Sequence, residues 1–471
     1  MSPAGAPLPA GGPRRLSDVE AAFAYTHALM RGTTQVTTRL SVRGALPDAV
    51  LERAVRGWAR DVPLLRLRIE ERPDGLWFRQ GPPDPEAGQL RYGPFPGART
   101  PDEVLRAELN DVLPTGGPLW RLRAVRATGE THLFFTRNHA ISDGHSTGAV
   151  LRALLDRLPA TAGRGAAAVP VAAAGAGAGA AQPFTDVRRL PPNADGLEYL
   201  PPAAPEAPGE PPAGLPEPVP FAASARWADR TADFTALELT AQQTAALRSW
   251  CRARGVTVNQ FLGAALAEAW TGVAGRPEVR LLTAVSLRGR YPEAVLPDVG
   301  CFINVVGVPV RPDTTGRTDE TARAYGAALR EADARWLPPR RDHAAIRRAV
   351  GAAAAATGAP GICITNVGVV DPALGAHAGR VTAFRTVVNR TGANYALVLH
   401  AATFAGGLSL ALAHGAPATD PATARAVARA LHERLLRPGG PAGASPSAAP
   451  SAAPGRAVRE SARRTPAAAA G

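Results

Sequence analysis

Residues 138–144 of the chain read Asn138-His139-Ala140-Ile141-Ser142-Asp143-Gly144, and they follow the apolar run Leu133-Phe134-Phe135. That run predicts a buried β-strand over 131–138, which places His139 at a strand end. A histidine held there can point its ring into a cleft, and its ordinary pKa of about 6.5 lets it accept a proton near neutral pH. His139 is therefore the candidate general base.

The Asp143-Gly144 pair is typical of a turn, so we do not expect Asp143 to pair with His139 as it would on a helix. We expect Asp143 to brace the loop or to meet an arginine. Gly144 would permit a positive φ or a close approach of substrate. The local pattern leaves one alternative open, a strand-end histidine that only takes part in a hydrogen-bonded turn.

The chain has 471 residues, of which 45% are hydrophobic and 20% charged, enough for two or three folded units. We predict an N-terminal subdomain over 14–158 and a C-terminal subdomain over 226–437. Segments rich in alanine, glycine and proline bury too little apolar surface to fold alone. We therefore predict that 1–13, 159–225 and 438–471 lack a fold of their own.

Secondary structure is predicted from capping boxes and alternation. Helices are expected to begin at Ser17, Thr100, Thr240 and Thr257, each followed three residues later by glutamate or glutamine. Strands are expected at 36–42, 65–69, 120–124, 131–138, 281–288, 303–310, 361–366, 381–388 and 395–402. Gly406-Gly407 is typical of a hairpin turn. Interspersed helices and strands favour two mixed α/β units.

The formal net charge is +13, and every basic residue is arginine. The excess of arginine, alanine, glycine and proline fits a GC-rich coding bias. Because no basic run of five residues occurs, we expect no nucleic-acid partner. The positive surface leaves open an electrostatic funnel for an anionic small molecule or an acidic carrier protein.

The three cysteines are Cys251, Cys301 and Cys363, and no metal-ligand spacing includes them. We interpret them as small buried hydrophobes of a cytoplasmic protein without disulfides, metal or cofactor. We also expect no signal peptide and no transmembrane segment. Of the other histidines, His145 is expected at the surface near the next helix start, and His132 on the far face of the strand.

The motif resembles the signature of the chloramphenicol-acetyltransferase-like superfamily, which includes peptide condensation domains and polyketide-associated acyltransferases. Further matching segments occur in the expected order across about 15–415. They lie at 16–20, 46–54, 62–66, 255–262, 285–288, 300–304 and 365–368. Many condensation domains carry two adjacent histidines, and here the first is Asn138, which slightly favours a freestanding acyltransferase.

The resemblance implies an α/β (α+β) chain of two similar subdomains in a V-shape, with a tunnel between them and His139 midway along it. It makes His139, Asp143 and Gly144 the candidate catalytic residues. Arg288 is the candidate partner of Asp143, with an exposed strand arginine as the alternative. Asn304 and Asn366 are candidate substrate-binding residues, with a structural role as the alternative.

The function implied is transfer of an acyl group from acyl-CoA or an acyl-carrier-protein thioester to the hydroxyl of a natural-product or lipid acceptor. A freestanding condensation enzyme that forms an amide is the alternative within the same fold. A catalytically silent docking protein is the alternative outside enzymology. The donor would be a substrate rather than a cofactor, and we expect a monomer because the two halves cover each other's faces.

Overall fold

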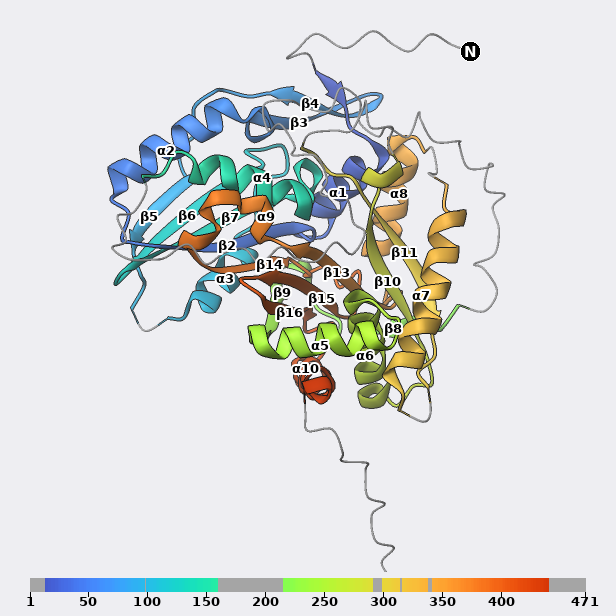
Figure 1. Cartoon of the computed structure of the whole chain (residues 1–471). Helices are drawn as coiled ribbons and strands as arrows, with labels where there is room; N and C mark the ends of the chain where they lie inside the picture. The colour runs from blue at the N-terminus through green and yellow to red at the C-terminus, as the bar shows by residue number, and fades with distance from the viewer. Residues whose placement is uncertain are drawn as a thin grey trace, which may run out of the picture.

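The computed structural model describes residues 13–97, 99–159, 215–290, 299–313, 316–337 and 341–439. The segments predicted to lack a fold, 1–13, 159–225 and 438–471, lie largely outside these ranges. The described chain forms two halves that meet along their sheets (Figure 1).

The first half begins its helices and strands as follows: β1 (Arg14–Arg15), α1 (Asp18–Leu29), β2 (Gln35–Arg43), α2 (Asp48–Asp61), β3 (Leu67–Arg72), β4 (Gly75–Gln80), β5 (Leu90–Pro94), α3 (Pro101–Asn110), β6 (Trp120–Ala127), β7 (Glu130–Asn138) and α4 (Gly144–Leu155). Its main sheet has the order β14-β2-β7-β6-β5. Strand β7 is central, so the residues that follow it are held from both sides.

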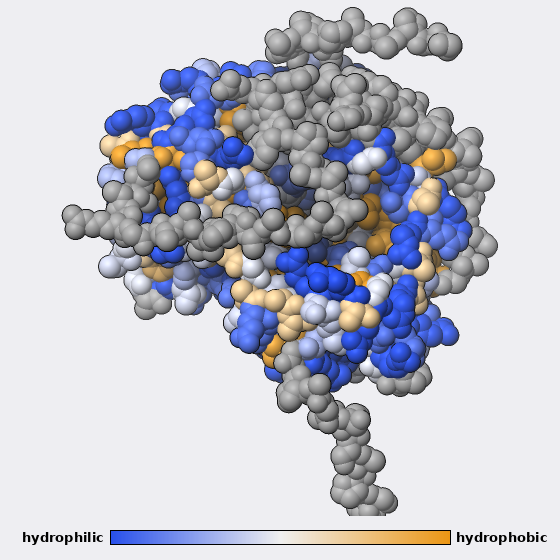
Figure 2. Space-filling model, in the orientation of Figure 1, coloured by the Kyte–Doolittle hydropathy of each residue, from blue (hydrophilic) through white to orange (hydrophobic). Residues whose placement is uncertain are grey.

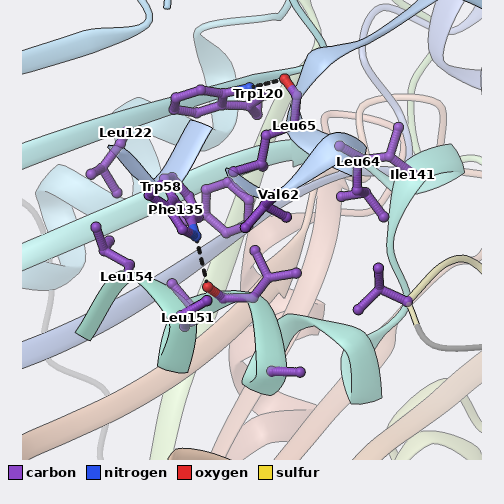
Figure 3. Close-up of a cluster of buried hydrophobic side chains, with 14 of the residues drawn as sticks. Trp58, Val62, Leu64, Leu65, Trp120, Leu122, Phe135, Ile141, Leu151 and Leu154 are labelled. Carbon is purple, nitrogen blue, oxygen red and sulfur yellow. Dashed lines mark hydrogen bonds between the residues drawn. The ribbon is translucent and has the colours of Figure 1, made fainter. Parts of the chain in front are cut away.

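A dense apolar core fixes strand β7 against helices α2 and α4 (Figure 3). Trp58 on α2 makes edge-to-face contacts with Trp120 and with Phe135, at centroid distances of 5.2 and 5.3 Å. The indole of Trp58 donates a hydrogen bond to the Val150 carbonyl at 2.8 Å, so no buried polar atom of this ring is left unpaired. Phe135 lies four residues before His139, and its packing makes the strand end rigid.

The second half continues the chain with β8 (Val219–Pro220), β9 (Thr231–Leu239), α5 (Ala241–Ala253), α6 (Val258–Ala274), β10 (Val279–Ser286), β11 (Ile303–Val310), α7 (Thr318–Arg335), α8 (His343–Ala354), β12 (Gly358–Ala359), β13 (Ile362–Val369), α9 (Asp371–Leu374), β14 (Val381–Val388), β15 (Val398–Phe404), β16 (Gly407–Ala416) and α10 (Pro421–Leu436). Its main sheet has the order β11-β10-β13-β15-β16-β9. The core between this sheet and helices α5, α6, α7 and α10 is separate from that of the first half.

Strand β14 leaves its own half and joins the first sheet. It pairs antiparallel with β2, from Val381 opposite Val42 to Val388 opposite Val36. The division into 14–158 and 226–437 therefore describes the order of the chain, whereas the sheets exchange this one strand. A third apolar cluster, which includes residues of α3 and of both sheets, further joins the halves.

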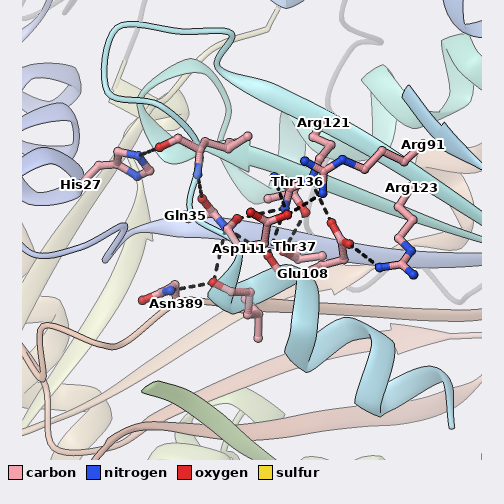
Figure 4. A network of polar contacts seen from close by, with 12 residues as sticks. His27, Gln35, Thr37, Arg91, Glu108, Asp111, Arg121, Arg123, Thr136 and Asn389 are labelled. Carbon is pink, nitrogen blue, oxygen red and sulfur yellow. Dashed lines mark hydrogen bonds and ion pairs between the residues drawn. The ribbon is translucent and has the colours of Figure 1, made fainter. Parts of the chain in front are cut away.

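A polar network lies at the start of β2, beside the ends of β7 and β14 (Figure 4). The side-chain amide of Gln35 donates to the main-chain carbonyls of Glu108 and Asp111 and accepts from the Leu113 amide. Asn389 donates to the Leu109 carbonyl at 2.7 Å. These bonds hold the main chain on both sides of the edge.

Most of the expected elements are present. All four capping boxes are found, with reciprocal hydrogen bonds at Ser17, Thr100, Thr240 and Thr257. Two details differ. The strand expected from Leu65 begins at Leu67, because Pro63 starts a 3-10 turn. The hairpin turn lies at Ala405-Gly406, where both φ angles are positive, and Gly407 already pairs in β16.

Hydrophilic residues dominate the surface over α2 and α7 on the face drawn in Figure 2, and hydrophobic ones form small separate patches there. Many arginines of the described chain are paired with carboxylates at the surface, for example Arg56 with Glu52. No helix among the described residues is long and apolar enough to cross a membrane.

Candidate active site

His139 begins a short 3-10 turn, His139–Ile141, directly after strand β7. The strand stops there because the side chain of Asn138 accepts a hydrogen bond from the Ala140 amide at 3.0 Å, which caps the turn. The apolar core beneath Phe135 and this cap together fix the main chain of His139.

Two side chains hold the imidazole ring of His139 in place. Phe23 on α1 stacks on it, with a centroid distance of 4.3 Å and an interplanar angle of 8°. Cys301 from the second half places its sulfur 3.6 Å from Nδ1. Among the described residues Nε2 has no hydrogen-bond partner, and the side chain is only partly buried. The nitrogen free to meet a reactant is therefore Nε2.

Burial, followed by the charge of Arg137, lowers the pKa of His139 to about 3. A hydrogen bond to its own main-chain carbonyl acts in the opposite direction. Nδ1 is the ring nitrogen that can reach its own carbonyl, so we assign the proton to Nδ1. The ring is thus neutral near pH 7, with the lone pair of Nε2 available to accept a proton.

Asp143 lies at the N-cap of α4, and its carboxylate is fully used inside the protein. It accepts from the Ser146 amide at 2.7 Å and from the Phe302 amide at 3.1 Å. Arg288 contacts it at 3.1 Å, and both side chains are at least 96% buried. Burial alone would raise the pKa of Asp143, but Arg288 and these hydrogen bonds more than offset it and lower the pKa.

The Asp143–Arg288 pair joins the two halves. Arg288 also donates to the Ser146 hydroxyl at 2.8 Å, and that hydroxyl in turn contacts the Gly300 carbonyl at 2.9 Å. The Asp143 amide donates to the same carbonyl. The partner expected for Asp143 from the sequence is therefore present, and the alternative of an exposed Arg288 is wrong. The carboxylate positions the His139 loop and is not aimed at the imidazole.

Gly144 has a different role from the one expected. Its φ is not positive, and it is the first residue of α4. A side chain here would collide with Val367 of the second half, because a Cβ would lie 2.4 Å from the valine Cγ1. Close packing between the halves, rather than turn geometry or substrate approach, requires glycine at this position.

Asn304 and Asn366 lie in the second sheet, and the structure records no contact of either with His139. Asn366 accepts a hydrogen bond from the Gly368 amide at 2.9 Å, where β13 departs from regular pairing. The side-chain amide nitrogen of Asn304 is buried and has no partner among the described residues. Asn366 therefore fits the structural alternative, and a role for Asn304 in substrate binding stays a prediction.

The sequence did not indicate several groups that lie near His139. Arg137, two residues earlier, is 1% exposed and donates to the Thr38 hydroxyl at 3.2 Å. Burial lowers its pKa to about 9. Alternation along β7 could have found Arg137. Burial lowers the pKa of His400, and the charge of Arg390 lowers the pKa of both His400 and His139. The sequence could not place either residue near His139, because both lie far from it along the chain.

Of the remaining candidates, only Cys301 has a recorded contact with the imidazole within the described chain. His145 is exposed on the first turn of α4. His132 contacts the Ser41 hydroxyl at 2.7 Å and packs against Phe95. All three cysteines are free and buried, although Cys301 touches His139, which the sequence did not indicate. Over the described ranges, no group of histidine, cysteine and acidic residues could hold a metal ion.

Comparisons with known proteins agree with this architecture. Residues 228–413 match a family described as phthiocerol/phthiodiolone dimycocerosyl transferase C-terminus. The fold is similar to that of the first condensation domain of the calcium-dependent antibiotic synthetase, with 18% identity and a TM-score of 0.61 over 91% of this chain and 98% of that one. It is also similar to polyketide synthase associated protein 5 from Mycobacterium tuberculosis, with 16% identity and a TM-score of 0.56 over 90% and 97%.

A cyclization-docking bidomain from Sorangium cellulosum is similar too, with 17% identity and a TM-score of 0.60 over 94% of this chain and 87% of that one. No curated protein sequence matches the chain. These structural likenesses cover both halves and confirm the two-lobed α/β fold expected from the sequence. The tunnel between the halves stays a prediction.

Proposed function

We propose that this chain, which has the chloramphenicol-acetyltransferase-like fold of condensation domains and polyketide-associated acyltransferases, transfers an acyl group from a thioester with His139 as general base. One observation carries the proposal. A neutral imidazole is held between residues of both halves, and its Nε2 has no partner among the described residues. The tunnel expected for this fold would bring donor and acceptor to that nitrogen from opposite sides.

The reaction would use the imidazole twice. As the acceptor oxygen attacks the thioester carbonyl carbon, its proton passes to Nε2. The tetrahedral intermediate then collapses, the carbon–sulfur bond breaks, and the imidazolium returns the proton to the thiolate. The products are the acyl ester and the free thiol, and the enzyme is unchanged.

Asp143 and Gly144 act in this proposal by position. Asp143 would hold the loop through Arg288, and Gly144 would let α4 approach Val367. Neither touches the reacting atoms, so His139 is the catalytic residue and the other two are positioning residues. The oxyanion of the intermediate needs hydrogen-bond donors, and the buried Arg137 is the cation whose charge acts most strongly on His139.

We further propose acyl-CoA or an acyl carrier protein as donor, and a hydroxyl group of a natural product or lipid as acceptor. The family matched by 228–413 is named for a phthiocerol/phthiodiolone dimycocerosyl transferase, which supports a transferase with a lipid-like acceptor. The positive charge of the chain favours an anionic donor. The three free cysteines fit the cytoplasm. Amide formation is the second candidate, because condensation domains are among the similar structures.

Release of free thiol from a panel of acyl-CoA thioesters, with hydroxyl and amine acceptors, tests the proposal. His139→Ala is expected to lower the rate by roughly 10²–10⁴-fold, the usual contribution of a general base. His145→Ala is the matched control, since this histidine is exposed six residues away and should leave the rate unchanged. Equal rates for wild type and His139→Ala would contradict the proposal. Absence of turnover with every donor would favour a silent docking protein.

A further inference from the structure

Arg390 and His139 both lie just beyond the same end of two strands in one sheet. Strands β14 and β7 both pair antiparallel with β2, so they run parallel to each other. His139 directly follows β7, and Arg390 lies two residues beyond the end of β14. Asn389 exchanges main-chain hydrogen bonds with the 34–35 segment, which is opposite Asn138. Two strand spacings, or about 10 Å, therefore separate the two main-chain positions.

The main chain of Arg390 is tightly held. Its carbonyl accepts from the Ala393 amide at 2.8 Å. Gly415 packs so closely that a Cβ there would lie 2.1 Å from the same carbonyl oxygen. The neighbouring Asn389 donates to the Leu109 carbonyl, as Figure 4 shows. The side chain therefore starts from a fixed point.

The guanidinium of Arg390 has no hydrogen-bond or ion-pair partner in the described chain. The residue is 7% exposed, yet it makes no hydrogen bond or ion pair with any described residue. Its only ring contact is with Tyr395, 5.3 Å from the ring centroid. Its Nε is fully buried without a partner, whereas its terminal nitrogens are not among the fully buried unpaired atoms. The terminal nitrogens therefore keep some exposure, within the 7% that the residue retains.

Every other buried arginine of the described chain donates to at least one oxygen of the protein, although Arg137 meets only the Thr38 hydroxyl and Arg230 only the Ala225 carbonyl. Arg121 pairs with Glu108, Arg385 with Asp102 and Arg288 with Asp143. Burying a cation without an anion costs several kcal/mol, and arginine does not readily escape that cost by losing its proton. An arginine left alone beside a candidate base is therefore suited to receive an anion from outside.

A second cation lies nearby. Arg280 on β10 lies against Gly307 of the neighbouring strand β11, where a Cβ would come within 2.7 Å of its Nε. Its Nε is also buried without a partner. The Tyr395 ring lies within electrostatic reach of both Arg280 and Arg390. The intervening sheet surface is largely apolar, with Leu282, Cys363 and Val398 packed beside Tyr395.

We propose that Arg390, assisted by Arg280, binds a carboxylate carried by the substrate. The inference rests on the proposed acyl transfer, since it assigns a substrate class to the same site. We do not assign the phosphates of CoA to this site, because an extended pantetheine arm would hold them farther from the thioester than the main-chain spacing of about 10 Å between His139 and Arg390. The carboxylate belongs either to the acyl chain or to the acceptor. Once bound, it would offset part of the positive charge that acts on His139.

The kinetic test compares matched substrates. In the donor arm, glutaryl-CoA is compared with its terminal amide; in the acceptor arm, a hydroxy acid is compared with its amide. Wild type is expected to prefer the carboxylate in one arm, and Arg390→Gln to lose roughly 10- to 100-fold of that preference. Arg390→Lys should retain part of it. Arg252→Gln, an exposed arginine of α5, is the control and should retain all of it.

A binding measurement keeps this test separate from the test of acyl transfer. Calorimetry with glutarate and with the hydroxy acid needs no turnover, and Arg390→Gln should weaken the binding of one of them by a similar factor. If neither the wild type nor any variant turns over a donor, the proposal of acyl transfer is wrong. The calorimetric binding result would still show whether Arg390 binds a carboxylate. Three outcomes would overturn the carboxylate site: no preference in either arm, equal losses for carboxylate and amide, or a loss seen with CoA thioesters but not with pantetheine thioesters.

Discussion

Arg288 and Arg390 are buried arginines of the second half, and both act close to the His139 loop, yet their surroundings differ. Arg288 contacts the carboxylate of Asp143 and the hydroxyl of Ser146. Arg390 has no hydrogen-bond or ion-pair partner among the described residues and lies over the ring of Tyr395. The chain thus supplies an anion for one cation and leaves the other without one.

This difference separates two functions that a buried charge can serve. A buried pair whose members satisfy each other fixes a structure, and here it joins the two halves at the loop that carries His139. A buried charge without a partner destabilises the empty protein and favours any ligand that neutralises it. Substitutions of the two arginines should therefore change stability in opposite directions.

Arg288→Leu should have the larger effect. It leaves the Asp143 carboxylate buried without its cation, so the free energy of unfolding should fall by about 3–5 kcal/mol. Urea denaturation followed by circular dichroism measures the change. Arg226→Ala, which removes an exposed pair with Asp229, is the control and should alter stability by less than about 1 kcal/mol.

Adding Asp143→Leu to Arg288→Leu sharpens this prediction. The double variant no longer buries a lone charge, so it should recover part of the lost stability. A single Arg288→Leu variant that unfolds like wild type would show that the pair does not hold the halves together.

Arg390→Met should have a smaller effect of the opposite sign. Methionine removes the unpaired charge while it keeps an unbranched side chain, so the free energy of unfolding should rise by about 1–4 kcal/mol. The same urea titration measures it. A clear loss of stability would mean that the protein itself satisfies Arg390, and the contrast with Arg288 would then disappear.

The local elements of the fold could be predicted because their signals are short-range. Each capping box pairs a cap residue with one three positions later, and all four were found where the sequence indicated. The exchange of β14 into the first sheet could not be predicted, because it pairs 381–388 with residues more than 300 positions away. Alternation predicts a strand but not its neighbour.

For the site, too, the sequence predicted the residues that belong to a local motif but not the contacts between the two halves. His139 and Arg288 were identified from their motif and from a resemblance, and the structure pairs Arg288 with Asp143 as expected. The stacking of Phe23 and the contact of Cys301 with His139 depend on how the halves meet. The isolation of Arg390 could not be predicted, since a missing partner is visible only when every neighbour is in place.

The central claim is that His139 is a neutral imidazole whose Nε2 is ready to accept a proton, and a titration by nuclear magnetic resonance tests it most directly. The folded pKa of about 3 lies below the unfolded value of about 6.5, so protonation favours the unfolded chain and is resisted by the folded one. With nitrogen-15-labelled histidine and His139→Ala for assignment, the account predicts that the His139 signals stay those of the neutral ring with its proton on Nδ1 from pH 8 to pH 5. A midpoint near pH 6.5, or a proton on Nε2 at pH 7, would contradict it.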